Sequence, residues 1–101
     1  MHLHRVKLLR IVAEARLRDD VVRLLAGAGV HGYTITSVGG SGANGDRFGT
    51  TVETSNVLIE TVAAEEKALE ALDLVHRSLL GRNAVIAYLM DATVLRREKF
   101  L

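Results

Sequence analysis

The stretch VGGSGANGDRFG, Val38 to Gly49, decides between two folds. Its residues Gly40 to Gly45 match the pattern G-x-G-x-x-G, which in dinucleotide-binding proteins follows a strand and opens a helix of a parallel βαβ unit. The residues that come next, 48-FGTTV-52, are poor helix formers. A P-loop is also excluded, because the chain contains no Gly-Lys-Ser or Gly-Lys-Thr. We therefore predict a long loop that connects two antiparallel strands.

The residues before this loop predict a strand, a helix and a second strand. Val6 to Ala13 form a short apolar run with β-branched members, which is typical of a strand. The segment 14–29 then repeats apolar residues at helical spacing: Leu17, Val21, Leu24, Leu25 and Ala28. Gly29 is expected to end this helix in the left-handed conformation. Gly32 to Val38 are rich in β-branched and aromatic residues and predict the second strand.

The residues after the loop predict the same three kinds of element in turn. Ser55 to Val62 indicate a strand, and Ala84 to Leu95 indicate a long final strand. Between them, the segment 63–81 is the clearest helix of the chain, with acids in its first turn, bases in its last and Gly81 after them.

The predicted order β-α-β-β-α-β is that of an α+β, ferredoxin-like sandwich. We expect two helices on one face of a four-stranded antiparallel sheet, in a single domain over residues 1–101 with a mobile loop at about 39–54. The last strand is apolar almost continuously up to Met90, so both of its faces should be covered. We therefore expect other subunits to bury the second face of the sheet.

Composition excludes several classes of function. The 13 basic and 12 acidic residues leave a net charge of +1, and aromatic residues make up 4%, so nucleic-acid binding is not expected. The absence of cysteine excludes disulfides, thiolate metal sites and a catalytic thiol. No apolar run approaches the roughly 20 residues of a membrane span, so we expect a cytoplasmic protein that does not insert into a membrane. No nucleophile–base–acid set is visible, and no enzymatic activity is predicted.

The loop itself is open to two interpretations. A loop of this length in a small domain is usually functional or disordered. Gly39, Gly40 and Gly42 let backbone N–H groups approach a ligand closely, and Arg47 supplies a guanidinium group for an anion. This composition favours binding of an anion or a nucleotide phosphate, with a disordered hairpin tip as the alternative.

The stretch HGYTITSVGGSG, His31 to Gly42, resembles the second strand and the start of the T-loop in PII signalling proteins. The βαββαβ order matches that family along almost the whole chain. The Gly-Tyr-Thr at 32–34 and the double glycine at 39–40 are most similar to the PII-like branch linked to bicarbonate uptake and carboxysomes. The resemblance implies a homotrimer that binds adenine nucleotides between subunits and uses the T-loop to contact a target, often a membrane transporter.

Individual site residues follow from the same resemblance. It implies that Gly39, Gly40, Ser41 and Gly42 wrap the phosphates and that Arg47 binds them. Arg96 and Arg97 fall roughly where the family places phosphate-binding arginines that act across subunits. Ile35, Thr36, Val85, Ile86 and Ala87 are the candidates for the wall around the adenine. Because Ser41 and Asn44 replace basic residues of the relatives, AMP, ADP or cAMP is expected in preference to ATP, with bicarbonate as a further candidate ligand. No cofactor is expected.

The chain departs from the nitrogen-sensing branch of that family. Arg82 to Val85 stand where that branch carries a Gly-Asp-Gly-Lys segment whose lysine holds phosphates. The glutamine that helps to bind 2-oxoglutarate with magnesium is missing, and so is the T-loop tyrosine that is uridylylated. We therefore do not expect nitrogen sensing of the usual kind.

Two other functions compete with this interpretation. One is a trimeric metal-responsive protein of the divalent-ion-tolerance type that would use His2, His4 and carboxylates. A frayed, exposed terminus is the favoured explanation of this H-x-H, and no metal site is predicted. The other is a regulatory module that binds an amino acid or another small metabolite, or a small enzyme. Such modules bind through a glycine after the first strand, where this chain has 13-AEARLRDD-20.

Overall fold

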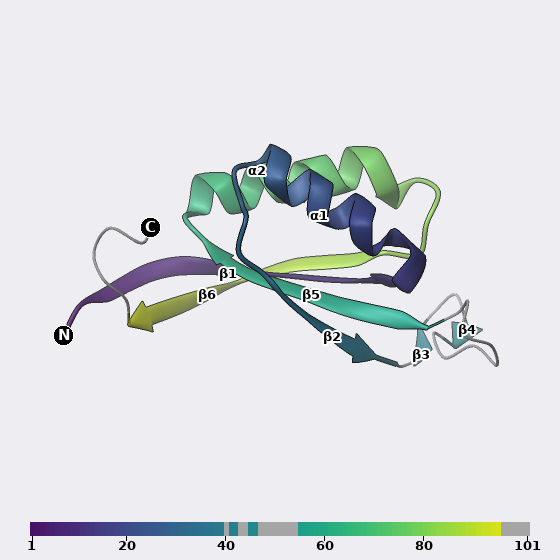
Figure 1. Cartoon of the computed structure of the whole chain (residues 1–101), viewed down its shortest axis with the longest axis horizontal. Coiled ribbons are helices and arrows are strands. Elements are labelled where there is room, and N and C mark those ends of the chain that lie inside the picture. Colours follow the sequence, from purple (N-terminus) through teal and green to yellow (C-terminus); the bar gives the residue numbers. More distant parts are fainter. Residues whose placement is uncertain (40, 43–44, 47–54, 96–101) are drawn as a thin grey trace.

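The computed structural model describes residues 1–39, 41–42, 45–46 and 55–95 (Figure 1). The strands are β1 (Leu3–Glu14), β2 (Thr34–Val38), β3 (Ser41–Gly42), β4 (Gly45–Asp46), β5 (Asn56–Ala63) and β6 (Ile86–Leu95). The helices are α1 (Arg18–Gly27) and α2 (Glu65–Val75). A 3-10 turn (Ala15–Leu17) precedes α1, and a π-helical turn (His76–Leu80) extends α2.

Four strands form one antiparallel sheet in the order β2-β5-β1-β6. Ile11 on the central strand β1 lies opposite Ile59 of β5 on one side and Ala87 of β6 on the other. Both helices cover the same face of this sheet (Figure 1). The predicted ferredoxin-like βαββαβ sandwich is therefore confirmed.

The core lies between the sheet and the two helices. Alternation along β1 points Leu9, Ile11 and Ala13 toward the helices, and all three are fully buried. The helices pack on these three residues with side chains at helical spacing, including Val21 and Val75, which are also fully buried. One apolar layer thus holds both helices on the sheet.

Several elements differ in length from the prediction. β1 begins at Leu3 because its first residues pair with the end of β6, where Leu3 lies opposite Leu95. Because of this pairing, His4 and Arg5 belong to the strand. Their polarity gives no indication of a strand in the sequence. The predicted end of α1 is confirmed by Gly29, which has a φ of +82°.

The face of the sheet away from the helices is open over β6 in the described part of the chain, although Val6 and Leu58 on it are buried. It exposes Ile86, Tyr88 and Met90 of β6 by 46%, 36% and 50%. Alternation explains this, since the intervening Ala87 and Leu89 pack against the core on the helix side. We call this surface the open face. None of the helices in the described part of the chain is long and apolar enough to cross a membrane.

Candidate functional site

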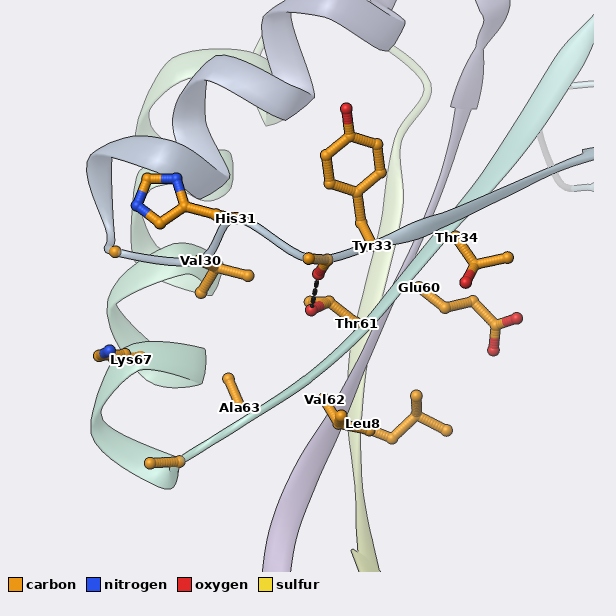
Figure 2. Close-up of a pocket in the computed structure, with 13 residues that line it drawn as sticks. Leu8, Val30, His31, Tyr33, Thr34, Glu60, Thr61, Val62, Ala63 and Lys67 are labelled. Atoms are coloured by element: carbon orange, nitrogen blue, oxygen red, sulfur yellow. Dashed lines mark hydrogen bonds between the residues drawn. The ribbon is translucent and has the colours of Figure 1, made fainter. Parts of the chain in front are cut away.

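A pocket of ≈ 590 Å³ lies where β2 begins and β5 ends, beside the start of α2 (Figure 2). Its walls combine apolar and polar groups from all of these elements. Its lining includes Val30, His31, Thr34, Glu60, Val62 and Lys67. A pocket of this size with a few polar groups suits a small organic ligand.

The connection from α1 to β2 forms one wall of this pocket. Gly29 turns the chain at the end of α1, and the backbone N–H of Val30 donates to the carbonyl of Leu25 at 2.8 Å. The hydroxyl of Thr61 on β5 then donates a hydrogen bond to the carbonyl of Gly32 (Figure 2). These contacts hold the connection against the end of β5 and fix the shape of the pocket.

Opposite charges lie on the two sides of the pocket. Glu60 and Thr34 lie on one side, whereas Lys67 and His31 lie on the side of α2 (Figure 2). Glu60 pairs with Arg10 of β1, whose Nε lies 3.1 Å from the Glu60 Oε2. Lys67 makes no ion pair with any described residue, so its ammonium group is available to an anion.

The glycine-rich stretch lies at the other end of β2. Val38 is the last residue of β2 and lies opposite Asn56, and the exposed Gly39 follows it. The backbone of Ser41–Gly42 then pairs antiparallel with Gly45–Asp46. This ladder replaces the helix that a dinucleotide fingerprint requires. Gly40, Arg47, Arg96 and Arg97 lie outside the described residues.

The five residues expected around the adenine do not line one cavity within the chain. Ile35 and Thr36 belong to β2. Val85 directly precedes β6, and Ile86 and Ala87 are its first two residues. The strands β2 and β6 are the two edge strands of the sheet. Ile35, Val85 and Ala87 pack against the core. Thr36 and Ile86 are exposed at opposite ends of one row across the open face. Within the described chain, the two groups therefore lie at opposite edges of the sheet.

Hydrogen bonds hold the loop between α2 and β6 at the same end of the sheet as Gly39. The side-chain amide of Asn83 donates to the carbonyl of Leu79 at 2.9 Å, and Arg16 donates to the Asn83 Oδ1 at 3.1 Å. Arg16 also donates to the Glu14 carboxylate at 3.0 Å. The segment that departs from the Gly-Asp-Gly-Lys pattern is therefore anchored by contacts of its own.

No sequence pattern assigned the pocket residues Thr34, Glu60 and Lys67 to the site. Glu60 offered a signal, because it is the one charged residue in the mostly apolar strand 57-VLIETVA-63. A charge that alternation places in the middle of a sheet face needs a partner, which points to Arg10. Lys67 offered none, since a lysine in the first turn of a helix is ordinarily a solvated residue.

A second hollow of ≈ 520 Å³ lies where β1 begins and β6 ends. Here Lys7 donates a hydrogen bond to Asp91 and lies 3.9 Å from the Glu65 Oε1. The hydrogen bond raises the pKa of Lys7 and lowers the pKa of Asp91. Since these charges satisfy each other, this hollow offers less to a ligand than the pocket beside β2.

No three histidine or acidic side chains among the described residues are grouped closely enough to hold a metal ion. His2 precedes β1 and His4 lies within it. The described part of the chain thus provides no support for the metal-responsive alternative.

The family model described as nitrogen regulatory protein P-II matches residues 6–99. A PII-like signaling protein from Thermus thermophilus is 38% identical over 100% of both chains, with a TM-score of 0.86. CPII from Thiomonas intermedia, bound to ADP and bicarbonate, is 26% identical over 94% of this chain and 93% of its own, with a TM-score of 0.82. The apo form of CPII is 26% identical over 95% of this chain and 98% of its own, with a TM-score of 0.74. No curated protein matches the chain.

Proposed function

Because the chain belongs to the P-II family of regulatory proteins, we propose that it is a trimeric switch that binds an adenine nucleotide between its subunits. P-II proteins are trimers that bind adenine nucleotides and act in signalling, not as enzymes. The regulatory unit is the single domain of residues 1–101. Its ligand controls the long loop (39–54), and the loop controls a target protein.

The observation that carries this proposal is the pocket beside β2. It combines apolar side chains such as Val30 and Val62 with the polar Thr34, Glu60 and Lys67. An aromatic base packs on apolar side chains, while its amino group and the ribose hydroxyls need polar partners. CPII, which shares this fold at 26% identity, is bound to ADP and bicarbonate.

The positions of the two halves of the proposed site support a site that is shared between subunits. Thr34 in the pocket and Gly39 at the start of the loop are five residues apart along an extended strand, or roughly 17 Å at about 3.3 Å per residue. This separation favours a site to which two chains contribute. A nucleotide between subunits contacts the pocket of one and the loop of the next.

The phosphate end of the proposed site consists of Gly39, Gly40, Ser41, Gly42 and Arg47, with Arg96 and Arg97 from across the subunit boundary. The adenine end adds the proposed wall residues Ile35, Thr36, Val85, Ile86 and Ala87, of which Ile35, Val85 and Ala87 also pack against the core. Few cations serve the phosphate end, so we favour AMP, ADP or cAMP over ATP. Bicarbonate is proposed as a second ligand.

The target is proposed to be an inorganic-carbon transporter or a carboxysome-linked process. A nucleotide changes the loop only to the extent that it binds one loop conformation more tightly than the other. No metal or organic cofactor is needed for such a switch.

A panel of ligands tests this function. The melting temperature of the purified protein is measured with AMP, ADP, ATP, cAMP and bicarbonate, and with GTP as a control. We expect AMP, ADP or cAMP to raise it more than ATP and GTP do, because a ligand that binds only the folded state stabilises it. A protein whose melting temperature responds to no adenine nucleotide does not have the proposed function.

A further inference from the structure

One polar row crosses the open face of the sheet. The strand register places Tyr88, Arg10, Glu60 and Thr34 side by side across β6, β1, β5 and β2. The rows on either side of it are mostly apolar: Ile86, Val12 and Leu58 in one, and Met90, Leu8 and Val62 in the other. Arg10 and Glu60 thus form a charged pair in apolar surroundings.

Arg10 is held between a carboxylate and an aromatic ring. Its Nε lies 3.1 Å from the Glu60 Oε2, and its guanidinium carbon lies 5.5 Å from the centroid of the Tyr88 ring. The second distance is within the range of a cation–π contact. The buried Nε makes no aligned hydrogen bond to any described residue, so the contact with Glu60 is chiefly one of charge.

Glu60 belongs to two surfaces at once. Its carboxylate lines the pocket beside β2 (Figure 2) and also takes part in the polar row. A carboxylate without a partner in a pocket repels the phosphates of a nucleotide. The same carboxylate, once its charge is balanced, accepts hydrogen bonds from the neutral hydroxyl and amino groups of the nucleoside.

We propose that Arg10 is a positioning residue that balances the charge of Glu60 and thereby lets the pocket accept an anionic nucleotide. This inference rests on the proposed function. Arg10 does not touch the ligand. It acts through Glu60, and Tyr88 keeps the guanidinium group in place.

The test compares a charged ligand with a neutral one. Calorimetry measures the affinities of ADP and adenosine for the wild type and for R10Q, R10K, E60Q and the double variant R10Q/E60Q. We expect R10Q to lower the ratio of ADP affinity to adenosine affinity about tenfold, because it leaves a negative charge unbalanced. R10K should keep most of the ratio and the double variant should restore it. E60Q alone should raise the ratio above that of the wild type, because Arg10 then carries an unbalanced positive charge.

The control is R77Q, which removes an arginine of the same charge from an exposed ion pair with Asp73 on α2. It should leave both affinities unchanged. If R10Q does not fold, the comparison of E60Q with the wild type still decides the question. The proposal is overturned if R10Q leaves the ratio unchanged, or if E60Q leaves it unchanged or lowers it. A wild type that binds adenosine and ADP equally poorly overturns the nucleotide function itself, and this role with it.

Discussion

Lys7 connects three elements through one ammonium group. It joins β1 to Asp91 on β6 and to Glu65 at the start of α2. Asp91 and Glu65 are exposed, so the contribution to stability is small and decreases with salt. The two pKa shifts nevertheless make this contribution depend on pH.

The acid side of this dependence is testable with Asp91→Asn. The lowered pKa of Asp91 means that its contribution is present above the ordinary value of 3.8 and is lost as the pH falls through the lower folded value. For Lys7, whose pKa is raised, the contribution is present below 10.5 and is lost as the pH rises through the higher folded value. Urea unfolding between pH 7 and pH 2 should show a smaller acid loss in Asp91→Asn than in the wild type. Parallel curves would contradict this assignment. Asp73→Asn is the control, because it removes an exposed ion pair between α2 and Arg77 in the π-helical turn.

The left-handed backbone conformation of Gly29, at the edge of the pocket, is testable by substitution. Its φ of +82° is strained for any residue with a side chain, although an added Cβ would have room, since the nearest atom is the Lys67 Cε at 3.6 Å. Gly29→Ala should therefore lower the free energy of unfolding by about 1–2 kcal/mol through backbone strain. Gly81→Ala, at a φ of −69° with no atom within 4 Å, should be neutral or stabilising by at most about 1 kcal/mol. Equal effects of the two variants in denaturant titrations would exclude the backbone explanation.

Among the elements, β6 joins the core to the open face. Because side chains alternate along the strand, Ala87 and Leu89 are partly buried on the helix side, whereas Ile86, Tyr88 and Met90 are exposed. Such a row on a long edge strand is a surface for association. In the proposed trimer, the open face is the surface that the other subunits cover.

Ile86→Asp should break this association without unfolding the chain. A carboxylate at that position would be buried without a partner in the trimer but solvated in the monomer. Sedimentation should therefore show monomers of Ile86→Asp at concentrations where the wild type is trimeric. Leu69→Asp is the matched control, because Leu69 on α2 is exposed by 49%, close to the 46% of Ile86. A trimeric Ile86→Asp, or a monomeric Leu69→Asp, would place the interface elsewhere.

The sequence predicted the elements better than their ends. Periodicity identified both helices, because the buried Val21, Leu25, Ala68 and Val75 recur at helical spacing. It did not identify the first residues of β1, since His4 and Arg5 are in a strand only because β6 pairs with them. A partner that is distant in the sequence leaves no local pattern.

The site was less predictable than the fold for the same reason. The glycines of the loop were visible as a motif, whereas the pocket depends on the Thr61 hydroxyl reaching the Gly32 carbonyl and on Arg10 meeting Glu60 across two strands. Both contacts require the register of the sheet. The G-x-G-x-x-G pattern alone would have suggested a different fold.

For the whole molecule, the proposed function requires one nucleotide for each subunit of a trimer. In the proposed trimer, each site takes its halves from neighbouring chains, because the pocket and the start of the loop lie at opposite ends of β2. A monomer would then bind the nucleotide weakly, and occupancy and assembly should depend on each other.

Native mass spectrometry with ADP tests this claim most directly, because it measures assembly and occupancy together. A trimer with shared sites predicts a species of three 11.0-kDa chains that carries up to three ADP molecules, with little ADP on any monomer. A trimer that retains no ADP, or a monomer that binds ADP as tightly as the trimer does, would contradict it.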